Sequence, residues 1–440
     1  MSFRIAVREL CEFTAKSGDL DLRFTPVPSA QEGMEGHRIV ASRRGPDYQA
    51  EIPLSADYGP LQLRGRCDGF DAESGRLEEV KTFRGDLHRL PGNQRQLHWA
   101  QAKLYGAMLC AQQQREELEI ALVYFDVGTQ KETVLTEHFT ADELQVFFQE
   151  HCERFLLWAK QEMAHREARD TSLASLSFPF AAFRHGQRLL AKGVYRAARD
   201  GHCLLAQAPT GIGKTLGTLF PLLKACPEQA IDRIFFLTAK TPGRALALEA
   251  AQRLLQSDDG LRLRVLELSA RDKACVHPDK ECHGESCPLA RGFYDRLPAA
   301  RAEAVGYGLL DQAALARIAA AHDICPYYLG QELARWSDMV VGDYNYYFDG
   351  SALLYGLTQR REWKIALLVD EAHNLVSRAR EMYSAELQPA RLAALRKTVP
   401  TALKRPLGRL QKVWDALHEG RFNPLDPEAP PKEYECCDKL

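Results

Sequence analysis

The stretch APTGIGKT, residues 208–215, decides the fold of the larger part of this chain. The apolar run HCLLAQ (202–207) precedes it, and the helix-forming run TLGTLFPLLKAC (215–226) begins at its last residue. This order predicts a strand, a glycine-rich turn and a helix. Such a turn lets backbone N–H groups surround a phosphate, to which the N-terminus of the helix adds partial positive charge.

Four residues of this turn have the types that a bound nucleotide requires. Gly211 and Gly213 allow the backbone to approach the phosphates, Lys214 would reach the β- and γ-phosphates, and Thr215 would bind Mg²⁺. The strict pattern has a glycine where this chain has Ala208. A strand-to-helix turn with no ligand is the structural alternative, which the Lys-Thr pair disfavours. The stretch therefore predicts a binding site for ATP with Mg²⁺.

The tetrapeptide DEAH (370–373) closes the apolar run KIALLVD (364–370). An acidic residue at the carboxyl end of a strand lies at the edge of the sheet where ligands bind. We expect Asp370 to hold Mg²⁺ through water, Glu371 to polarise the attacking water as a catalytic residue, and His373 to report the nucleotide state. A polar helix start after a buried strand is the alternative, and the phosphate-binding turn upstream disfavours it.

Two further segments carry candidate contacts. In FRHGQ (183–187), Arg184 and Gln187 are expected to contact the nucleotide base or the phosphate-binding turn, unless this is only a solvated helix start. In TAKTPGRA (238–245), Lys240 and Arg244 are candidate contacts to DNA phosphates, and a solvated loop is the alternative.

The rhythm of apolar runs divides the chain into α/β units. From residue 178, strands alternate with helices, which predicts a parallel sheet covered on both faces. The N-terminal unit is expected to hold these elements: a helix at 2–16, strands at 61–70, 75–83 and 118–127, and helices at 93–114 and 141–169. The polar stretch DTSLASLS (170–177) is the expected linker. We therefore predict domains at 1–170 and 178–380, followed by a helical segment and a poorly ordered tail at 381–440.

Composition excludes some classes of protein. The 440 residues are 45% apolar and 26% charged with a net charge of −2, so a nucleic acid would have to be held by local basic patches. No apolar run approaches the roughly 20 residues of a membrane helix, and MSFRIAVREL has no signal-peptide core. We expect a cytoplasmic protein, in a bacterium and associated with the nucleoid, with no membrane partner and with reduced thiols.

The stretch CVHPDKECHGESC (275–287) gathers three of the twelve cysteines, and Cys325 follows. Six residues separate Cys275 from Cys282 and four separate Cys282 from Cys287, which fits poorly the two-to-four-residue gaps of structural zinc. Iron–sulfur clusters tolerate wider gaps. Zinc bound with His277 or His283, and thiols without a metal, remain alternatives.

These motifs together resemble the XPD/DinG family of superfamily 2 DNA helicases, over about residues 178–380. The resemblance rests on APTGIGKT, DEAH, the cysteine stretch and CPYYLGQELARWSDMVVGDYNYYFDG (325–350). It implies a RecA-like motor domain with an iron–sulfur insert at about 270–335. It further implies a 4Fe–4S cluster on Cys275, Cys282, Cys287 and Cys325, and ATP-driven 5′→3′ movement on single-stranded or forked DNA in repair or replication.

The N-terminal unit carries a second set of candidate catalytic residues in RCDGFDAESGRLEEVKTF (66–83). Glu79 and Lys81 share one face of a strand, and a hairpin can bring Asp68 beside them. Two carboxylates would bind Mg²⁺ or Mn²⁺, and the lysine would orient a water for attack on a phosphodiester.

This hairpin resembles the PD-(D/E)xK nuclease core, a restriction-endonuclease-like α/β fold. Gln101 and Tyr105 resemble the Q-x₃-Y motif of RecB-type nucleases, and Glu9 is a further candidate metal ligand. The sequence departs from the core pattern at Cys67, where the motif has proline. A solvated charged hairpin, and a nuclease fold retained only to bind DNA, are the alternatives.

The C-terminal part resembles the start of the arch insert of the same helicases, over 386–417. A second RecA-like domain is missing after DEAH, so we expect the N-terminal part of a longer helicase, which alone would bind ATP weakly and not unwind DNA. A non-catalytic module that binds single strands or junctions is the competing hypothesis.

Overall fold

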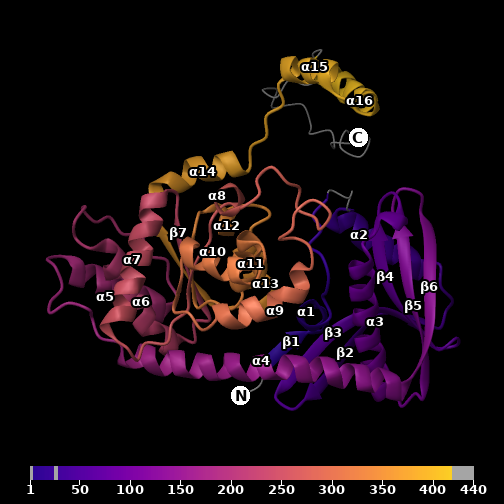
Figure 1. The fold of residues 1–440 in the computed structure, drawn as a ribbon, viewed down its shortest axis with the longest axis horizontal. Helices are drawn as coiled ribbons and strands as arrows, with labels where there is room; N and C mark the ends of the chain where they lie inside the picture. The colour runs from indigo at the N-terminus through magenta and orange to yellow at the C-terminus, as the bar shows by residue number, and fades with distance from the viewer. Residues whose placement is uncertain (1–2, 24–27, 419–440) are drawn as a thin grey trace, which may run out of the picture. The chain divides into compact units, whose positions relative to one another are not determined.

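The structure is a computed structural model that describes residues 3–23 and 28–418. It separates into two compact units, the first ending at His373 and the second beginning at Asn374. The ribbon of the chain is shown in Figure 1. The proline-rich tail predicted to be poorly ordered lies outside the described residues. None of the described helices combines the length and the apolar character that crossing a membrane requires.

The first unit begins with a six-stranded mixed sheet. Its order is β1-β3-β4-β5-β6, with β2 paired to the other side of β3 in antiparallel fashion. The strands are β1 (Phe3–Ala6), β2 (Tyr48–Tyr58), β3 (Leu61–Asp71), β4 (Arg76–Phe83), β5 (Glu117–Asp126) and β6 (Lys131–Thr140). The helices are α1 (Val7–Thr14), α2 (Ala30–Ser42), α3 (Gly92–Gln113) and α4 (Ala141–Ser175), with a 3₁₀ turn η1 (Leu87–Arg89).

Sequence periodicity predicted most of these elements and was wrong at three places. The expected N-terminal helix is split, because Phe3–Ala6 pairs with β3 and the helix begins only at Val7. The expected linker at 170–177 is helical as far as Ser175, since Leu173 and Leu176 are buried in the neighbouring core. Strands β2 and β6 were not predicted, because half-exposed strands rich in charge carry a weak apolar signal.

A second, five-stranded sheet follows, in which every pairing is parallel, in the order β11-β7-β10-β8-β9. Its strands are β7 (Arg233–Thr238), β8 (Val265–Glu267), β9 (Leu309–Leu310), β10 (Met339–Gly342) and β11 (Ile365–Asp370). The associated helices are α5 (Gln187–Asp200), α6 (Lys214–Gln229), α7 (Thr241–Ser257), α12 (Asn345–Phe348) and α13 (Leu353–Arg361), with η2 (Ala372–Asn374) after β11. The predicted parallel α/β sheet is therefore present.

The strand expected at HCLLAQ is not formed. Residues 202–209 have no regular secondary structure, and Leu205 is 90% exposed. An apolar run indicates that burial would be favourable. A strand also needs a neighbouring strand that supplies hydrogen bonds. In the described residues, this segment pairs with no strand, and β11 ends the sheet on that side.

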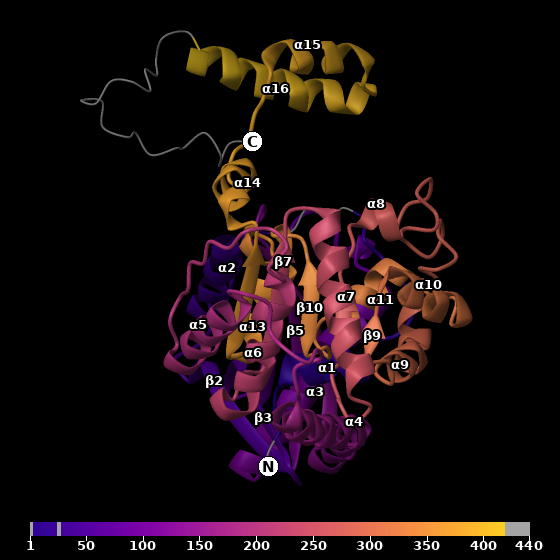
Figure 2. The ribbon, with the colours of Figure 1, turned by 90° about the vertical axis from the view of Figure 1, so that its left-hand side faces the viewer.

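The connection from β8 to β10 is a largely helical insert that also contributes β9. It contains α8 (Arg271–Ala274), the cysteine stretch, α9 (Phe293–Ala304), α10 (Gln312–Ala321) and α11 (Pro326–Leu333). Figure 2 shows these helices gathered beside β9 at one side of the sheet. Tyr344 is buried, and Tyr346 donates a hydrogen bond to the Ser269 carbonyl oxygen at 2.9 Å, so these rings of YNYYF pack inside the unit.

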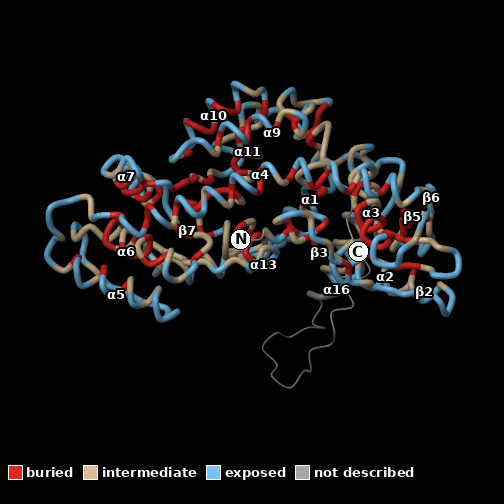
Figure 3. Tube along the Cα trace, turned by 90° about the horizontal axis from the view of Figure 1, so that it is seen from below, coloured by how far each residue is buried: buried red, intermediate tan, exposed pale blue. Residues whose placement is uncertain are grey.

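Helix α4 runs along both sheets without a break (Figure 1). It begins with a capping box, in which the Thr140 hydroxyl and the Glu143 carboxylate each accept a hydrogen bond from the other's backbone N–H. Its aromatic Trp158 lies 5.1 Å from Trp336, which belongs to the insert but is buried in the core of the N-terminal sheet. Figure 3 shows buried residues concentrated along α3 and β5 and again along α6 and β7. The first unit therefore has two apolar centres that share α4.

The second unit consists, over its described residues, of helices α14 (Leu375–Met382), α15 (Pro389–Thr398) and α16 (Thr401–His418). Helices α15 and α16 pack against each other. The predicted helical character of 386–417 is therefore present.

Candidate functional site

In the candidate phosphate-binding turn, residues 208–215, the backbone has at two positions a conformation that only glycine adopts readily. Gly211 and Gly213 have φ of +82° and +80°, in the left-handed region. A Cβ atom on Gly213 would lie 2.4 Å from Nε2 of Gln187, so a larger residue there would clash. Helix α6 begins at Lys214, whose ammonium group donates a hydrogen bond to the Ala208 carbonyl oxygen at 3.3 Å. The helix N-terminus and the lysine thus face the turn.

Arg184 and Gln187 lie against this turn. Arg184 donates to the Gly211 carbonyl oxygen at 2.7 Å, and the buried Gln187 donates to the Gly213 carbonyl oxygen at 3.0 Å. The sequence left open whether these side chains contact a base or the turn, and the structure places both at the turn. Phe183 stacks on Phe178 with ring centroids 4.0 Å apart, so its ring packs within the protein.

The DEAH acids lie at the carboxyl end of β11, beside the turn. Asp370 stands opposite Thr238 in the sheet register. Burial, and then the charge of Glu371, raises the pKa of Asp370, while the charge of Lys214 lowers it. The lysine and the aspartate are therefore electrostatic neighbours, as a shared Mg²⁺–phosphate ligand requires.

Glu371 has a left-handed backbone with φ of +52°. The Tyr344 hydroxyl donates to the carbonyl oxygens of Asp370 and Glu371, which fixes this strained peptide. His373 lies on the exposed side, with Nδ1 3.4 Å from the Glu371 carboxylate. Strain of this kind accumulates at functional sites because the surrounding structure must hold it.

The two candidate DNA contacts differ in exposure. Lys240 is exposed, next to the end of β7. Arg244 is buried, and its guanidinium group donates to the Leu268 carbonyl oxygen at 3.3 Å and to the Thr241 hydroxyl at 3.2 Å. The Arg244 side chain is thus already bound to protein atoms, and Lys240 alone of this pair presents its charge to solvent.

The four candidate cluster cysteines are half-buried free thiols. Burial raises the pKa of Cys325, and the charges of Cys275 and Cys282 raise it further. In the described part of the chain they do not form a group with all ligand atoms within 4.8 Å. The 4Fe–4S cluster on these residues therefore stays a prediction, as do the alternatives of zinc and of thiols without a metal.

The N-terminal hairpin does bring its predicted residues together. Lys81 Nζ lies 2.5 Å from the Glu79 carboxylate and 3.3 Å from the Gln101 amide oxygen. Asp68 accepts a hydrogen bond from the Val80 N–H at 2.7 Å. Tyr105, one turn along α3, is buried beside Gln101. Strands β3 and β4 and helix α3 therefore meet at one polar site inside an apolar core.

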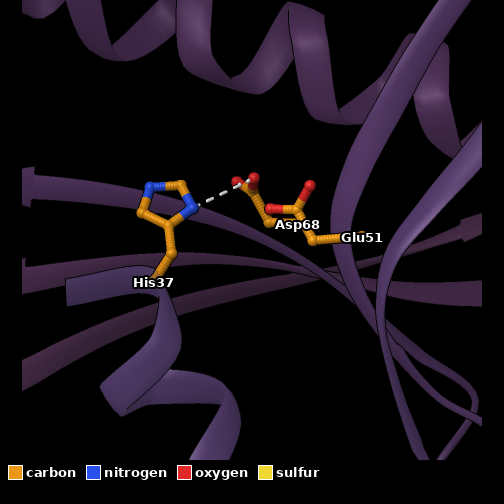
Figure 4. A group of neighbouring side chains, drawn as sticks. All are labelled: His37, Glu51 and Asp68. Carbon is orange, nitrogen blue, oxygen red and sulfur yellow. Dashed lines mark ion pairs between the residues drawn. The ribbon is translucent and has the colours of Figure 1, made fainter. Parts of the chain in front are cut away.

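Two residues of this site were missed by sequence reasoning. His37 on α2 and Glu51 on β2 join Asp68, and the ligand atoms of the three all lie within 4.8 Å of one another (Figure 4). His37 Nδ1 is 3.2 Å from the Asp68 carboxylate, whose hydrogen bond raises the pKa of His37. Glu51 has φ of +58°. The two carboxylates suit Mg²⁺ or Mn²⁺, and the added imidazole favours a transition metal such as Mn²⁺ over Mg²⁺.

Glu79 on β4 is the buried carboxylate of this site. Its side chain is 2% exposed, and one carboxylate oxygen, Oε2, has no hydrogen-bond partner among the described residues. Burial raises the pKa of Glu79 to about 7 against the opposing charge of Lys81, and the Asp68 charge adds to the rise. A buried oxygen without a partner is costly, and a bound cation would remove that cost.

Glu9, the further candidate ligand, is engaged elsewhere. Its carboxylate lies 3.0 Å from the guanidinium group of Arg361 on α13, so it connects the N-terminal sheet to the second sheet. Another residue of α1, Cys11, is influenced by the charge of the candidate site. Burial, and then the charge of Glu79, raises the pKa of its thiol.

The match to a family model covers the last part of the first unit and the start of the second. Residues 247–392 match the family model DEAD_2. The curated relatives named below are described as helicases. The chain is 25% identical over 282 residues to the Regulator of telomere elongation helicase 1 homolog of Anopheles gambiae, covering 52% of this chain and 28% of that protein. It is 27% identical over 271 residues to the Regulator of telomere elongation helicase 1 of Bos taurus, covering 50% and 22%.

The chain thus spans less than a third of the length of these two relatives. Among solved structures, it is similar to one described as "XPD_Helicase", with a TM-score of 0.37 and 19% identity over 53% of this chain and 40% of that chain. A second, "Truncated XPD", has a TM-score of 0.34 and 17% identity over 51% and 63%.

Proposed function

We propose that the protein is an ATP-driven DNA helicase of the XPD type that moves 5′→3′ and carries a metal-dependent nuclease domain at its N-terminus. The observation that carries the motor part is the position of Asp370 at the carboxyl end of β11, where the charge of Lys214 lowers its pKa. Asp370 also lies in the segment 247–392 that matches the family model DEAD_2. Motor domain boundaries of about 178–380 follow from the same motifs.

In this proposal each residue of the nucleotide site has one task. The N–H groups at the start of α6 and the Lys214 ammonium bind the phosphates, while Thr215 and Asp370 hold Mg²⁺. Glu371 orients the attacking water, and its proximity to His373 would make that imidazole sensitive to the nucleotide state. Gln187 and Arg184 stabilise the backbone of the turn through their hydrogen bonds to its carbonyl oxygens.

The cysteines are proposed to hold a 4Fe–4S cluster. Cys275, Cys282, Cys287 and Cys325 would be its ligands, and the cluster would supply a rigid centre for the insert. Four half-buried free thiols support this donor set, as does Cys325, whose pKa is raised by burial and further by Cys275 and Cys282.

Strand displacement by the complete protein tests the direction of movement. We expect ATP-dependent displacement from a duplex with a single-stranded 5′ tail, and none from the matched duplex with a 3′ tail. Lys240→Ala checks the expected contact of the exposed Lys240 with DNA phosphates on the same substrates. This variant should bind single strands more weakly, and its affinity should depend less on salt concentration. Equal displacement from both tails would contradict the proposed direction.

The nuclease part is a second candidate function, favoured by His37, Asp68 and Glu79 around one polar site. These groups would bind the metal ion, with Glu51 beside them. Lys81, held by Glu79 and Gln101, would orient the water that attacks a phosphodiester.

We expect Mn²⁺ binding and DNA cleavage to depend on pH and on Glu79. Because the pKa of Glu79 is raised to about 7, its carboxyl is mostly protonated at pH 6 and cannot bind metal, and the raised pKa of His37 acts in the same direction. Mn²⁺ affinity, measured by titration calorimetry, should therefore fall about tenfold from pH 8 to pH 6.

Matched variants test the same site. Glu79→Ala and Lys81→Ala should abolish cleavage of single-stranded DNA, and Glu79→Gln should remove most Mn²⁺ affinity. Glu73→Gln is the control, since Glu73 is exposed in the turn of the same hairpin. Equal cleavage by all variants, or none by the parent, would contradict the nuclease. DNA binding without cleavage or ATP turnover would instead favour the non-catalytic binding module.

A further inference from the structure

Residues 17–23 of the N-terminal sheet domain, which we name the brace, lie along the cysteine stretch of the insert. Three backbone hydrogen bonds join them. The Leu20 N–H donates to the Ala290 carbonyl oxygen and the Leu22 N–H to the Cys282 carbonyl oxygen, both at 2.9 Å, and the Tyr294 N–H donates to the Gly18 carbonyl oxygen at 3.0 Å. Segments more than 250 positions apart in the sequence are thus paired through their main chains.

One side chain of the brace fits closely into the same loop. Asp19 accepts a hydrogen bond from the Gly292 N–H at 2.7 Å. A Cβ atom on Gly284 would lie only 1.8 Å from the Asp19 carboxylate, so the loop has a glycine where the aspartate enters. The Gly18 N–H in turn donates to the Asp295 carboxylate at 2.9 Å. Residues of the brace and residues of the cysteine loop therefore both fit this contact.

The brace is itself fixed to the N-terminal sheet. Asn93 on α3 donates from its amide to the carbonyl oxygens of Ser17 and Asp19, both at 3.0 Å. Helix α3 also carries Gln101 of the candidate metal site. The cysteine loop is thus held by the N-terminal domain, and not only by the motor domain.

The loop has little internal support of its own. Helix α8 ends at Ala274 and α9 begins at Phe293, and between them the structure has only turns and bends. Its local hydrogen bonds are those of turns, such as the bond from the Cys287 N–H to the His283 carbonyl oxygen at 2.9 Å, and no α-helix or strand forms there. Few regular hydrogen bonds make such a segment prone to local opening. The carbonyl oxygen that Leu22 binds belongs to Cys282, a proposed cluster ligand.

We propose that the brace is part of the cluster-binding site, and that it positions Cys282 and Cys287 for the centre they share with Cys275 and Cys325. This inference rests on the proposed 4Fe–4S cluster. It assigns the N-terminal domain a task in cofactor retention that does not depend on its nuclease chemistry.

A pair of substitutions at Leu22 isolates one backbone contact. Leu22→Pro removes the N–H that binds the Cys282 carbonyl oxygen, whereas Leu22→Ala keeps that N–H, and the Leu22 side chain is 48% exposed. Asp19→Ala is an independent variant, which leaves the Gly292 N–H without its acceptor. Arg23→Ala is the control, because it removes side-chain ion pairs of a half-exposed guanidinium group, with Asp21 and with Glu285 of the loop, and leaves the three backbone hydrogen bonds in place.

The first measurement uses iron-free protein and needs no cluster. We expect alkylation of Cys282 and Cys287, followed by mass spectrometry, to be about fivefold faster in Leu22→Pro and Asp19→Ala than in the parent, because each loses about one hydrogen bond that keeps the loop closed. Leu22→Ala and Arg23→Ala should match the parent. The exposed Cys203 serves as the internal reference for reagent and folding.

The second measurement is the rate at which a chelator removes iron from anaerobically reconstituted protein. We expect about fivefold faster loss from Leu22→Pro and Asp19→Ala. Parent-like alkylation and iron loss in both variants would overturn the role of the brace. A parent that binds no iron and lacks absorbance near 400 nm would overturn the cluster itself, whereas the alkylation rates would still report on the brace.

Discussion

Lys214→Ala is expected to weaken the binding of Mg²⁺–ATP about tenfold to a hundredfold, the largest functional effect of any single substitution in the second sheet. A hydrogen bond to a charged group contributes about 1.5–3 kcal/mol, and this ammonium would make such bonds to two phosphates. Its ammonium group donates a hydrogen bond to the carbonyl oxygen of Ala208, the first residue of the turn. Equilibrium titration with a fluorescent ATP analogue measures the change.

The matched control is Lys224→Ala on the same helix. Lys224 lies away from the turn and donates to the Ala174 carbonyl oxygen at 2.5 Å. Its loss should leave nucleotide affinity within about twofold of the parent, since the charge is remote and solvent-screened. If the two variants lose affinity equally, Lys214 does not have the proposed task.

Asp338→Ala is expected to lower the free energy of unfolding by about 3–5 kcal/mol, the largest effect on stability. Asp338 is buried at the start of β10 and accepts hydrogen bonds from His165 at 2.8 Å and from the Arg264 N–H at 2.9 Å. It also pairs with Arg169 at 3.3 Å, whose side chain is only 3% exposed. Burial alone would raise the pKa of Asp338. The hydrogen bond from His165 and nearby positive charges outweigh burial and hold this pKa far below the usual range.

Removing the carboxylate therefore takes the acceptor away from His165 and from the Arg264 N–H, and it removes one of the two acidic partners that the buried Arg169 has among the described residues, while Asp170 remains. Urea unfolding followed by tryptophan fluorescence measures the loss. Asp200→Ala is the control, because Asp200 forms an exposed pair with Arg199 and such pairs contribute about 0–1 kcal/mol. Similar shifts in both variants would show that the buried pair contributes no more than a surface pair.

Local patterns were sufficient where the chemistry lies within a short stretch of chain. The phosphate-binding turn needs consecutive residues between a loop and a helix, so APTGIGKT predicted both the start of α6 and the position of Lys214. Likewise, Asp370 closes a strand, and parallel strands end at a common edge. The apolar run of β5 and the alternation of β3 and β4 also predicted the hairpin that brings Asp68 to Glu79.

The rest of the N-terminal site depends on long-range packing. His37 and Glu51 come from elements that carry no recognised motif, and only the sheet register and the seating of α2 place them beside Asp68. Long-range packing also decides the contact of Glu9, whose ion pair with Arg361 on α13 no local pattern on α1 predicts. The failed strand at HCLLAQ has the same origin, since an apolar run does not specify a pairing partner.

The unbroken course of α4 also has a practical consequence for anyone who wishes to study the halves of the protein separately. A gene divided near residue 175 would leave Phe13 and Trp158 in one product and Trp336 in the other, although these rings contact one another in a single core. Each fragment would then present an aromatic patch to water, so the enzymology of either half is best approached by inactivating the other in place.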